Sequence, residues 1–332
     1  MSNSDSISLT SSELGYLWTG FSINELSRWF LITFHEQAKD NDVKNIYANA
    51  LEIADKLLVG REKLLSKEGY PLPIGFSETD INKNAPTLFT DRFLLTYMLI
   101  GSQLGLEFHT RALGFSTRED VRNYLSECLE DAVQLNGKVN DLMLNKGIYW
   151  RTPTLPAPKS NEKIHKSSYL DGWLGDTRPM NSMEIANLYV VIELLIMIET
   201  ICIGFAQMSE EKNMTELFLS GGTLAKNQYH SLYELLTKDG LPIPPTYTSE
   251  MTDSNTRVFS DRIMVSHLAG LIGSLISQYG FALGSVMKHD LLATYSSLIS
   301  KAGAFAEKLT RILIDKEWLE KVPGAISRKD ID

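Results

Sequence analysis

Several glutamate and histidine residues of this sequence are candidates for binding a metal ion through their side chains. A two-metal carboxylate centre in a helix bundle needs Glu-x-x-His on two helices, because residues three apart project a carboxylate and an imidazole toward the same ion. Glu162 and His165 form the only such pair of this sequence. They lie in a proline-containing polar stretch, for which a solvated loop is the simpler interpretation. The sequence therefore predicts no two-metal centre in either half.

Glu25 is the acidic residue that helical periodicity places inside a bundle. It falls in the middle of an apolar stripe that includes Trp18 and Ile32, so its carboxyl group must be hydrogen-bonded, paired or protonated. His109 lies at the edge of a later helical stripe, about 9 Å from the level of Glu25 at 1.5 Å per residue, which disfavours coordination of one ion by both. Two interpretations remain: a buried acid bonded to a Tyr, Trp or Arg of another helix, or a remnant metal site.

The second half of the chain offers a different set of ligands. Glu199 and His267 lie at the edges of two apolar stripes, and His230 forms an i, i+4 pair with Glu234, which is commonly a surface pair. Glu199, His230 and His267 could bind one borderline metal ion. The candidate ligands are thus Glu25, His109, Glu199, His230 and His267; a single metal ion is the only cofactor considered, and no catalytic residue is predicted.

The elements that position these residues follow from an internal duplication. Gly-Tyr-Pro-Leu-Pro at 69–73 is followed 171 residues later by Gly-Leu-Pro-Ile-Pro, and Phe-Thr-Asp-Arg at 89–92 is followed 170 residues later by Phe-Ser-Asp-Arg. Thr90 and Ser260, or the Asp after each, are expected to cap a helix. Arg92 and Arg262 are expected to contact a carboxylate or the linker.

Capping and periodicity predict an all-α fold of two tandem four-helix bundles. Thr10 with Glu13, Ser116 with Glu119 and Asn181 with Glu184 have the spacing of capping boxes, and glycine and proline mark helix ends. Long crossovers at about 69–87 and 240–258 should join the second helix to the third in each bundle. The predicted domains are a first bundle at 1–146, a linker rich in proline and aromatic residues at 147–180, and a second bundle at 181–332.

The amino-acid composition limits the classes of partner and the cellular location that can be expected for this protein. The chain has 332 residues, a net charge of −9 and 22% charged residues, so nucleic acid and anionic membranes are disfavoured. The apolar windows are interrupted by polar residues and indicate bundle helices rather than membrane spans. Cys128 and Cys202 are far apart and suggest no disulfide framework, which favours a reduced, cytoplasmic location. A homo-oligomer or protein partners are possible.

Two helices, a long crossover and two further helices form the topology of ferritin-like bundles. With the repeated marks at 69–73 and 89–92 and the Leu-Thr-Ser-Ser-Glu start, the chain resembles an uncharacterised tandem ferritin-like family of spore-forming bacilli. The resemblance implies a bacterial, intracellular protein without an assigned activity. The leading hypothesis is a non-catalytic protein acting through its surface or in an assembly, in stress or sporulation; the alternatives are a metal-binding or oxidase-like bundle with an atypical Glu/His site, and a small-molecule carrier.

Overall fold

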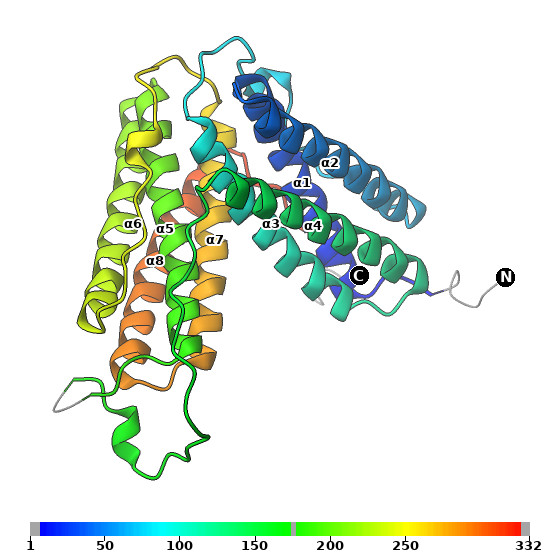
Figure 1. Cartoon of the computed structure of the whole chain (residues 1–332). Coiled ribbons are helices and arrows are strands. Elements are labelled where there is room, and N and C mark those ends of the chain that lie inside the picture. The colour runs from blue at the N-terminus through cyan, green and yellow to red at the C-terminus, as the bar shows by residue number, and fades with distance from the viewer. Residues whose placement is uncertain (1–6, 174–176, 327–332) are drawn as a thin grey trace. The chain divides into compact units, whose positions relative to one another are not determined.

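The computed structural model of the chain describes residues 7–173 and 177–326. Its regular elements are eight long helices and three short 3-10 helices within those ranges (Figure 1). The long helices are α1 (Ser11–Gln37), α2 (Asn41–Lys67), α3 (Asp91–Gly114), α4 (Glu119–Asn145), α5 (Ser182–Met208), α6 (Lys212–Lys238), α7 (Asp261–Ser285) and α8 (His289–Asp315).

Each half of the chain has the expected order of two helices, a crossover and two more helices. Helix α1 packs on α2, α3 packs on α4, and α5 packs on α6. The first crossover contains η2 (Glu78–Asp80) and the second contains η4 (Thr248–Glu250), while η3 (Ser167–Leu170) lies between the halves. Two tandem four-helix bundles with long crossovers are therefore confirmed.

Capping boxes start α1 and α5, as the sequence predicts. The Thr10 and Asn181 side chains each accept a hydrogen bond from the backbone N–H three residues on, and Glu13 and Glu184 accept one in return. The box predicted for Ser116 and Glu119 is wrong: Arg118 is the N-cap of α4, without a side-chain cap, and the Ser116 hydroxyl donates to the Ala112 carbonyl oxygen.

Glu13 replaces the missing cap of α4. One of its carboxylate oxygens accepts hydrogen bonds from the backbone N–H groups of Thr117 and Arg118, both at 2.8 Å, while the other accepts from Thr10. Burial alone would raise the pKa of Glu13, but these hydrogen bonds outweigh it and lower the pKa to about 2. The carboxylate thus ties the start of α1 to the α3–α4 turn.

The second bundle repeats this arrangement with an added arginine. Glu184 accepts from the backbone N–H groups of Met287 and Lys288 in the α7–α8 turn. Arg178, at the end of the linker, donates to both Glu184 carboxylate oxygens and stacks on the Tyr169 ring at 3.9 Å from its centroid. The end of the linker is therefore fixed to the second bundle.

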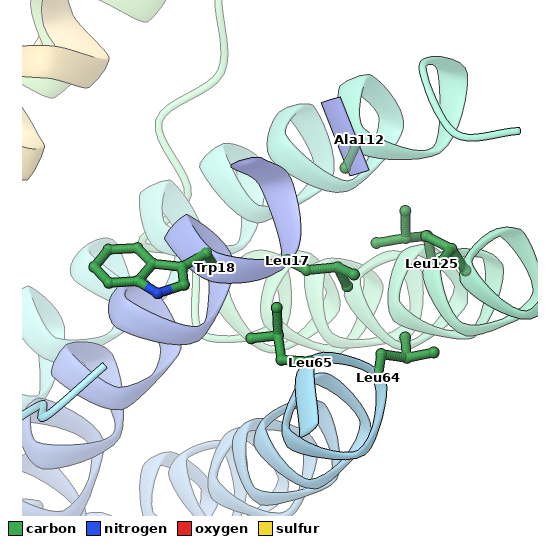
Figure 2. Packing of buried hydrophobic residues seen from close by; sticks show 7 residues of the cluster. Leu17, Trp18, Leu64, Leu65, Ala112 and Leu125 are labelled. Carbon is green, nitrogen blue, oxygen red and sulfur yellow. The ribbon is translucent and has the colours of Figure 1, made fainter. Parts of the chain in front are cut away.

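Apolar side chains from all four helices fill the end of the first bundle that Glu13 closes. Figure 2 shows Leu17 of α1 near Leu64 and Leu65 of α2, with Leu125 of α4 on the same side. Burial of such aliphatic and aromatic side chains is the main stabilising contribution. The cluster fixes the positions of the helices on which the polar residues described below lie.

Within the described residues, two helices, α5 and α7, are long and apolar enough to cross a membrane by length and composition alone. Most of α5 is buried inside the second bundle, as expected of a core helix. The glycines in the middle of α3 do not mark a close helix contact: Gly101 is exposed, and neither Gly101 nor Gly105 has a non-local atom within 4 Å of its ideal Cβ position.

The chain divides into two compact units whose bounds differ from those of the repeats. The first unit contains Met1–Ile148, Thr256–Ile263 and Lys316–Asp332; the second contains Tyr149–Asn255 and Met264–Asp315. Phe259 accordingly packs in the first unit, with its ring centroid 4.4 Å from that of Phe30. Residues that follow the second crossover thus complete the first unit.

Candidate functional site

The polar residues with the potential for chemistry lie at three places: at Glu25 and the first crossover, around Arg61 in the first bundle, and around Glu199 in the second. At the first place, Glu25 is half-buried rather than largely buried. Its carboxylate accepts hydrogen bonds from the Trp29 indole N–H at 2.9 Å and from the Phe76 backbone N–H at 2.7 Å. Burial raises the pKa of Glu25 against the lowering effect of these two bonds.

The crossover near Glu25 is held by other charged side chains of the first unit. Glu320 accepts hydrogen bonds from the backbone N–H groups of Ile74 and Gly75. Arg262 donates to the Gly75 carbonyl oxygen and stacks on the Phe76 ring at 4.5 Å from its centroid. Gly75 has φ +68°, a backbone conformation that favours glycine. A Cβ there would also lie 2.8 Å from a Glu25 oxygen, so a larger residue would displace the Glu25 carboxylate. Glu25 therefore binds the crossover backbone.

The repeated Phe-Thr-Asp-Arg and Phe-Ser-Asp-Arg marks have the expected capping role. Thr90 accepts from the Phe93 N–H, and Ser260 accepts from the Ile263 N–H. The Ser260 hydroxyl also donates to Asp80 at 2.6 Å, which joins the residues after the second crossover to the first. These marks position the start of α3 and of α7.

Arg61 of α2 is the polar residue that sequence reasoning missed. It is fully buried, and within the described ranges its three guanidinium nitrogens make no hydrogen bond of good geometry, the Tyr124 hydroxyl being a poorly aligned neighbour. The signal was available, because Arg61 occupies a stripe position four residues after Leu57 and three before Leu64. A charged side chain at such a position has to find a counter-charge.

His109 of α3 lies within electrostatic range of Arg61. Its side chain is buried, and its Nδ1 atom has no partner in the part of the chain that the structure describes. Burial, and then the charge of Arg61, lower the pKa of His109 to about 4, so the imidazole is neutral at pH 7. No interaction joins His109 to Glu25, in keeping with the separation expected from the helical rise.

In the second unit Glu199 is buried and bonded to the protein. Its Oε2 atom accepts a hydrogen bond from the Tyr229 hydroxyl at 2.8 Å, and Lys226 Nζ lies 3.9 Å from Oε1. His267 is buried, which lowers its pKa to about 3, and its ring meets that of Phe205. His230 is exposed and contacts the Tyr229 and Tyr233 rings.

The candidate ligands do not converge. Among residues 7–173 and 177–326, no three His, Cys, Asp or Glu side chains are grouped so that they could hold a metal ion. Glu162 and His165 are exposed. Sequence reasoning also gave no role to Glu193 of α5, whose pKa burial raises to about 7; no spacing motif marks it.

Fold and site define a tandem helical-bundle protein in which Glu13, Glu25 and Glu184 accept hydrogen bonds from backbone N–H groups of the chain itself. The chain belongs to the family described as protein of unknown function (DUF3231), whose profile matches residues 2–160 and again residues 168–331. The two matches agree with the duplication.

No curated protein matches the chain. Among solved structures, a crystal structure from Bacillus halodurans, titled as that of a "putative spore coat protein", is 26% identical, covers 47% of this chain and 100% of its own, and has a TM-score of 0.43.

Proposed function

We propose that this is a non-catalytic, ferritin-like protein that works by binding, through its surface or in an assembly, rather than by metal-dependent oxidation. The observation that supports the proposal is the use of the bundle carboxylates. The two oxygens of Glu25 accept from an indole and a backbone N–H, and Glu199 accepts from a tyrosine. A carboxylate that ligates a metal must direct its lone pairs to the ion, and here these lone pairs bind donors of the protein.

The proposal includes a location in the bacterial cytoplasm. Cys128 and Cys202 are buried as free thiols, and burial raises the pKa of each, so both favour the unreactive thiol form. This suits a reducing compartment. The resemblance to a family of spore-forming bacilli favours a role in stress or sporulation.

Metal analysis of the full chain tests the proposal. Protein produced with added iron, manganese or zinc should contain substoichiometric metal and should not accelerate Fe(II)-dependent oxygen consumption. Light scattering during size-exclusion chromatography would then report the assembly state.

Glu199→Gln provides the matched variant, because it removes the charge and keeps the shape of the buried carboxylate among the candidate ligands. Stoichiometric metal in the wild type that is lost in Glu199→Gln would overturn the proposal and favour the atypical Glu/His site. Equal, low metal content in both proteins would support it.

A further inference from the structure

The inference concerns the buried guanidinium of Arg61 and goes beyond the proposed function, on which it does not depend. An arginine side chain stays protonated at any physiological pH. Transfer of an unpaired charge from water into a protein interior costs several kcal/mol even after relaxation. Arg61 has no exposed surface and, within the described ranges, no hydrogen bond of good geometry at Nε or at either Nη; the Tyr124 hydroxyl beside it is neutral and makes only a poorly aligned contact with it. Its charge therefore calls for a compensating group.

The side chains around Arg61 do not supply a negative charge. The guanidinium carbon lies 5.6 Å from the centroid of the Tyr124 ring, and the Tyr124 hydroxyl donates to the Leu57 carbonyl oxygen at 2.7 Å. Burial raises the pKa of both Tyr124 and Cys128, so both are neutral at pH 7. The cation–π contact is favourable, but it leaves the net charge uncompensated.

Asp131 is the carboxylate that acts electrostatically on the residues around Arg61, and it already forms an ion pair with Lys56. Asp131 of α4 influences the pKa of His109 and of Cys128, and its Oδ2 atom binds Lys56 Nζ at 2.8 Å near the bundle surface. Arg61 is therefore the one fully buried cation of this region in the described part of the chain, and it faces neutral groups.

The backbone is shaped to admit the guanidinium. An ideal Cβ on Gly20 of α1 would lie 2.5 Å from Arg61 Nε and 2.7 Å from Nη2, and one on Gly60 would lie 2.2 Å from the Tyr124 ring. Two helical glycines, each unfavourable for helix stability, thus make room for the cation and for the ring that covers it. The glycines explain how the guanidinium is accommodated between α1 and α2, but they contribute no charge that balances it.

We propose that Arg61 holds a small, singly charged anion inside the first bundle, with His109 Nδ1 as a second polar contact. One guanidinium balances one negative charge, whereas a dianion such as sulfate would leave an excess charge among neutral side chains. The close contacts of Gly20 and Tyr124 favour a small ion. A halide and a small carboxylate such as formate share this chemistry.

Thermal unfolding of the full chain tests the site, with bromide, chloride and formate as probes. Protein is dialysed into a buffer of a large organic anion, and each probe is added at constant ionic strength. Because an anion that binds only the native state stabilises it by mass action, the unfolding of the first bundle should shift upward saturably, by roughly 5 °C at high occupancy. Sulfate at equal ionic strength should give no saturable shift.

Two variants separate the site from general salt effects. Arg61→Met removes the charge and retains an unbranched side chain, so the saturable shift should vanish; a raised melting temperature without the probes is also expected, because an uncompensated buried charge is removed. Arg122→Met makes the same change at an exposed arginine of α4 and should keep the full shift. Equal shifts in the wild type and in Arg61→Met would overturn the proposal.

Bromide diffraction makes the test independent of variant folding. Crystals of the wild-type protein grown with bromide should show an anomalous peak beside the Arg61 guanidinium. Absence of a peak there, together with absence of a saturable shift with formate, would refute the site. A shift with formate alone would assign the site to a carboxylate, and a shift with halides alone would assign it to a halide.

Discussion

Glu13→Gln should destabilise the first bundle more than its conservative nature suggests. One Glu13 oxygen accepts from the α3–α4 turn and the other from Thr10. A glutamine side chain has one acceptor oxygen, so its NH₂ group must face N–H donors on one of the two sides. The change therefore removes a charge-assisted acceptor and creates a repulsive donor–donor contact.

The magnitude follows from the pKa of Glu13. Its decrease from 4.5 to about 2 corresponds to about 3 kcal/mol at 1.36 kcal/mol per unit. Solvent screening near the end of the bundle reduces this figure, so we expect a loss of about 2 kcal/mol at pH 7. A carboxylate with a lowered pKa in the folded state stabilises the fold at pH values above its pKa in the unfolded chain. This stabilisation is lost as the pH falls from about 4.5 through 2. The difference in unfolding free energy between the wild type and Glu13→Gln should therefore roughly halve by pH 3.

Urea unfolding of the full chain at several pH values measures this difference, and hydrogen exchange assigns the loss to α1, α3 and α4. Glu119→Gln is the control: Glu119 is exposed in the first turn of α4, and its loss should cost a few tenths of a kcal/mol. Equal destabilisation by Glu13→Gln and Glu119→Gln at pH 7, or an effect of Glu13→Gln that is undiminished at pH 3, would refute the reasoning.

Three further substitutions test other contacts. Gly20→Ala should destabilise by about 2 kcal/mol because of overpacking against a buried guanidinium, whereas Gly15→Ala on the same helix, with open space around it, should be neutral or slightly stabilising in urea unfolding. Glu25→Gln should keep the fold and change stability by less than about 1 kcal/mol, because its partners are an indole and a backbone N–H; a larger loss would contradict this. Tyr229→Phe should cost about 1–3 kcal/mol in the second unit, since the buried Glu199 loses its hydroxyl donor; unchanged hydrogen exchange there would oppose that assignment.

The helices and their order could be predicted from sequence because they depend on local signals. Capping residues, glycine stops and the repeated crossover marks lie within a few residues of the ends that they determine. The start of α4 could not be predicted in this way: Glu13, which satisfies its backbone N–H groups, is 104 residues earlier than Thr117. The local Ser116–Glu119 spacing was overridden by that distant acceptor.

The contacts of the candidate site were harder to predict, because helical periodicity shows which face of a helix is buried but not which group a polar side chain on that face contacts. Glu25 was expected to find a side chain of another helix, and it instead binds Trp29 of its own helix and the Phe76 backbone. The spacing of Arg61 from Leu57 and Leu64 places it on their stripe, but spacing alone does not identify what faces its guanidinium group. Only side-chain positions show that its charge has no partner among the described residues.

The first unit includes residues that the ribosome adds long after the four helices of the first bundle. Arg262 contacts the crossover at Gly75 from 187 residues further along the chain, and Glu320 does so from 245 residues further. All four helices of the first bundle, the last of which ends at Asn145, are synthesised before these residues. Arg262 follows 117 residues later and Glu320 follows 175 residues later, which corresponds to roughly 6 to 23 s and 9 to 35 s at about 5–20 residues per second. The newly synthesised first bundle must therefore stay folded without the contacts that Arg262 and Glu320 make with its crossover. A premature stop codon before Glu320 would destabilise the first crossover, although Gly75 lies 245 residues earlier in the sequence.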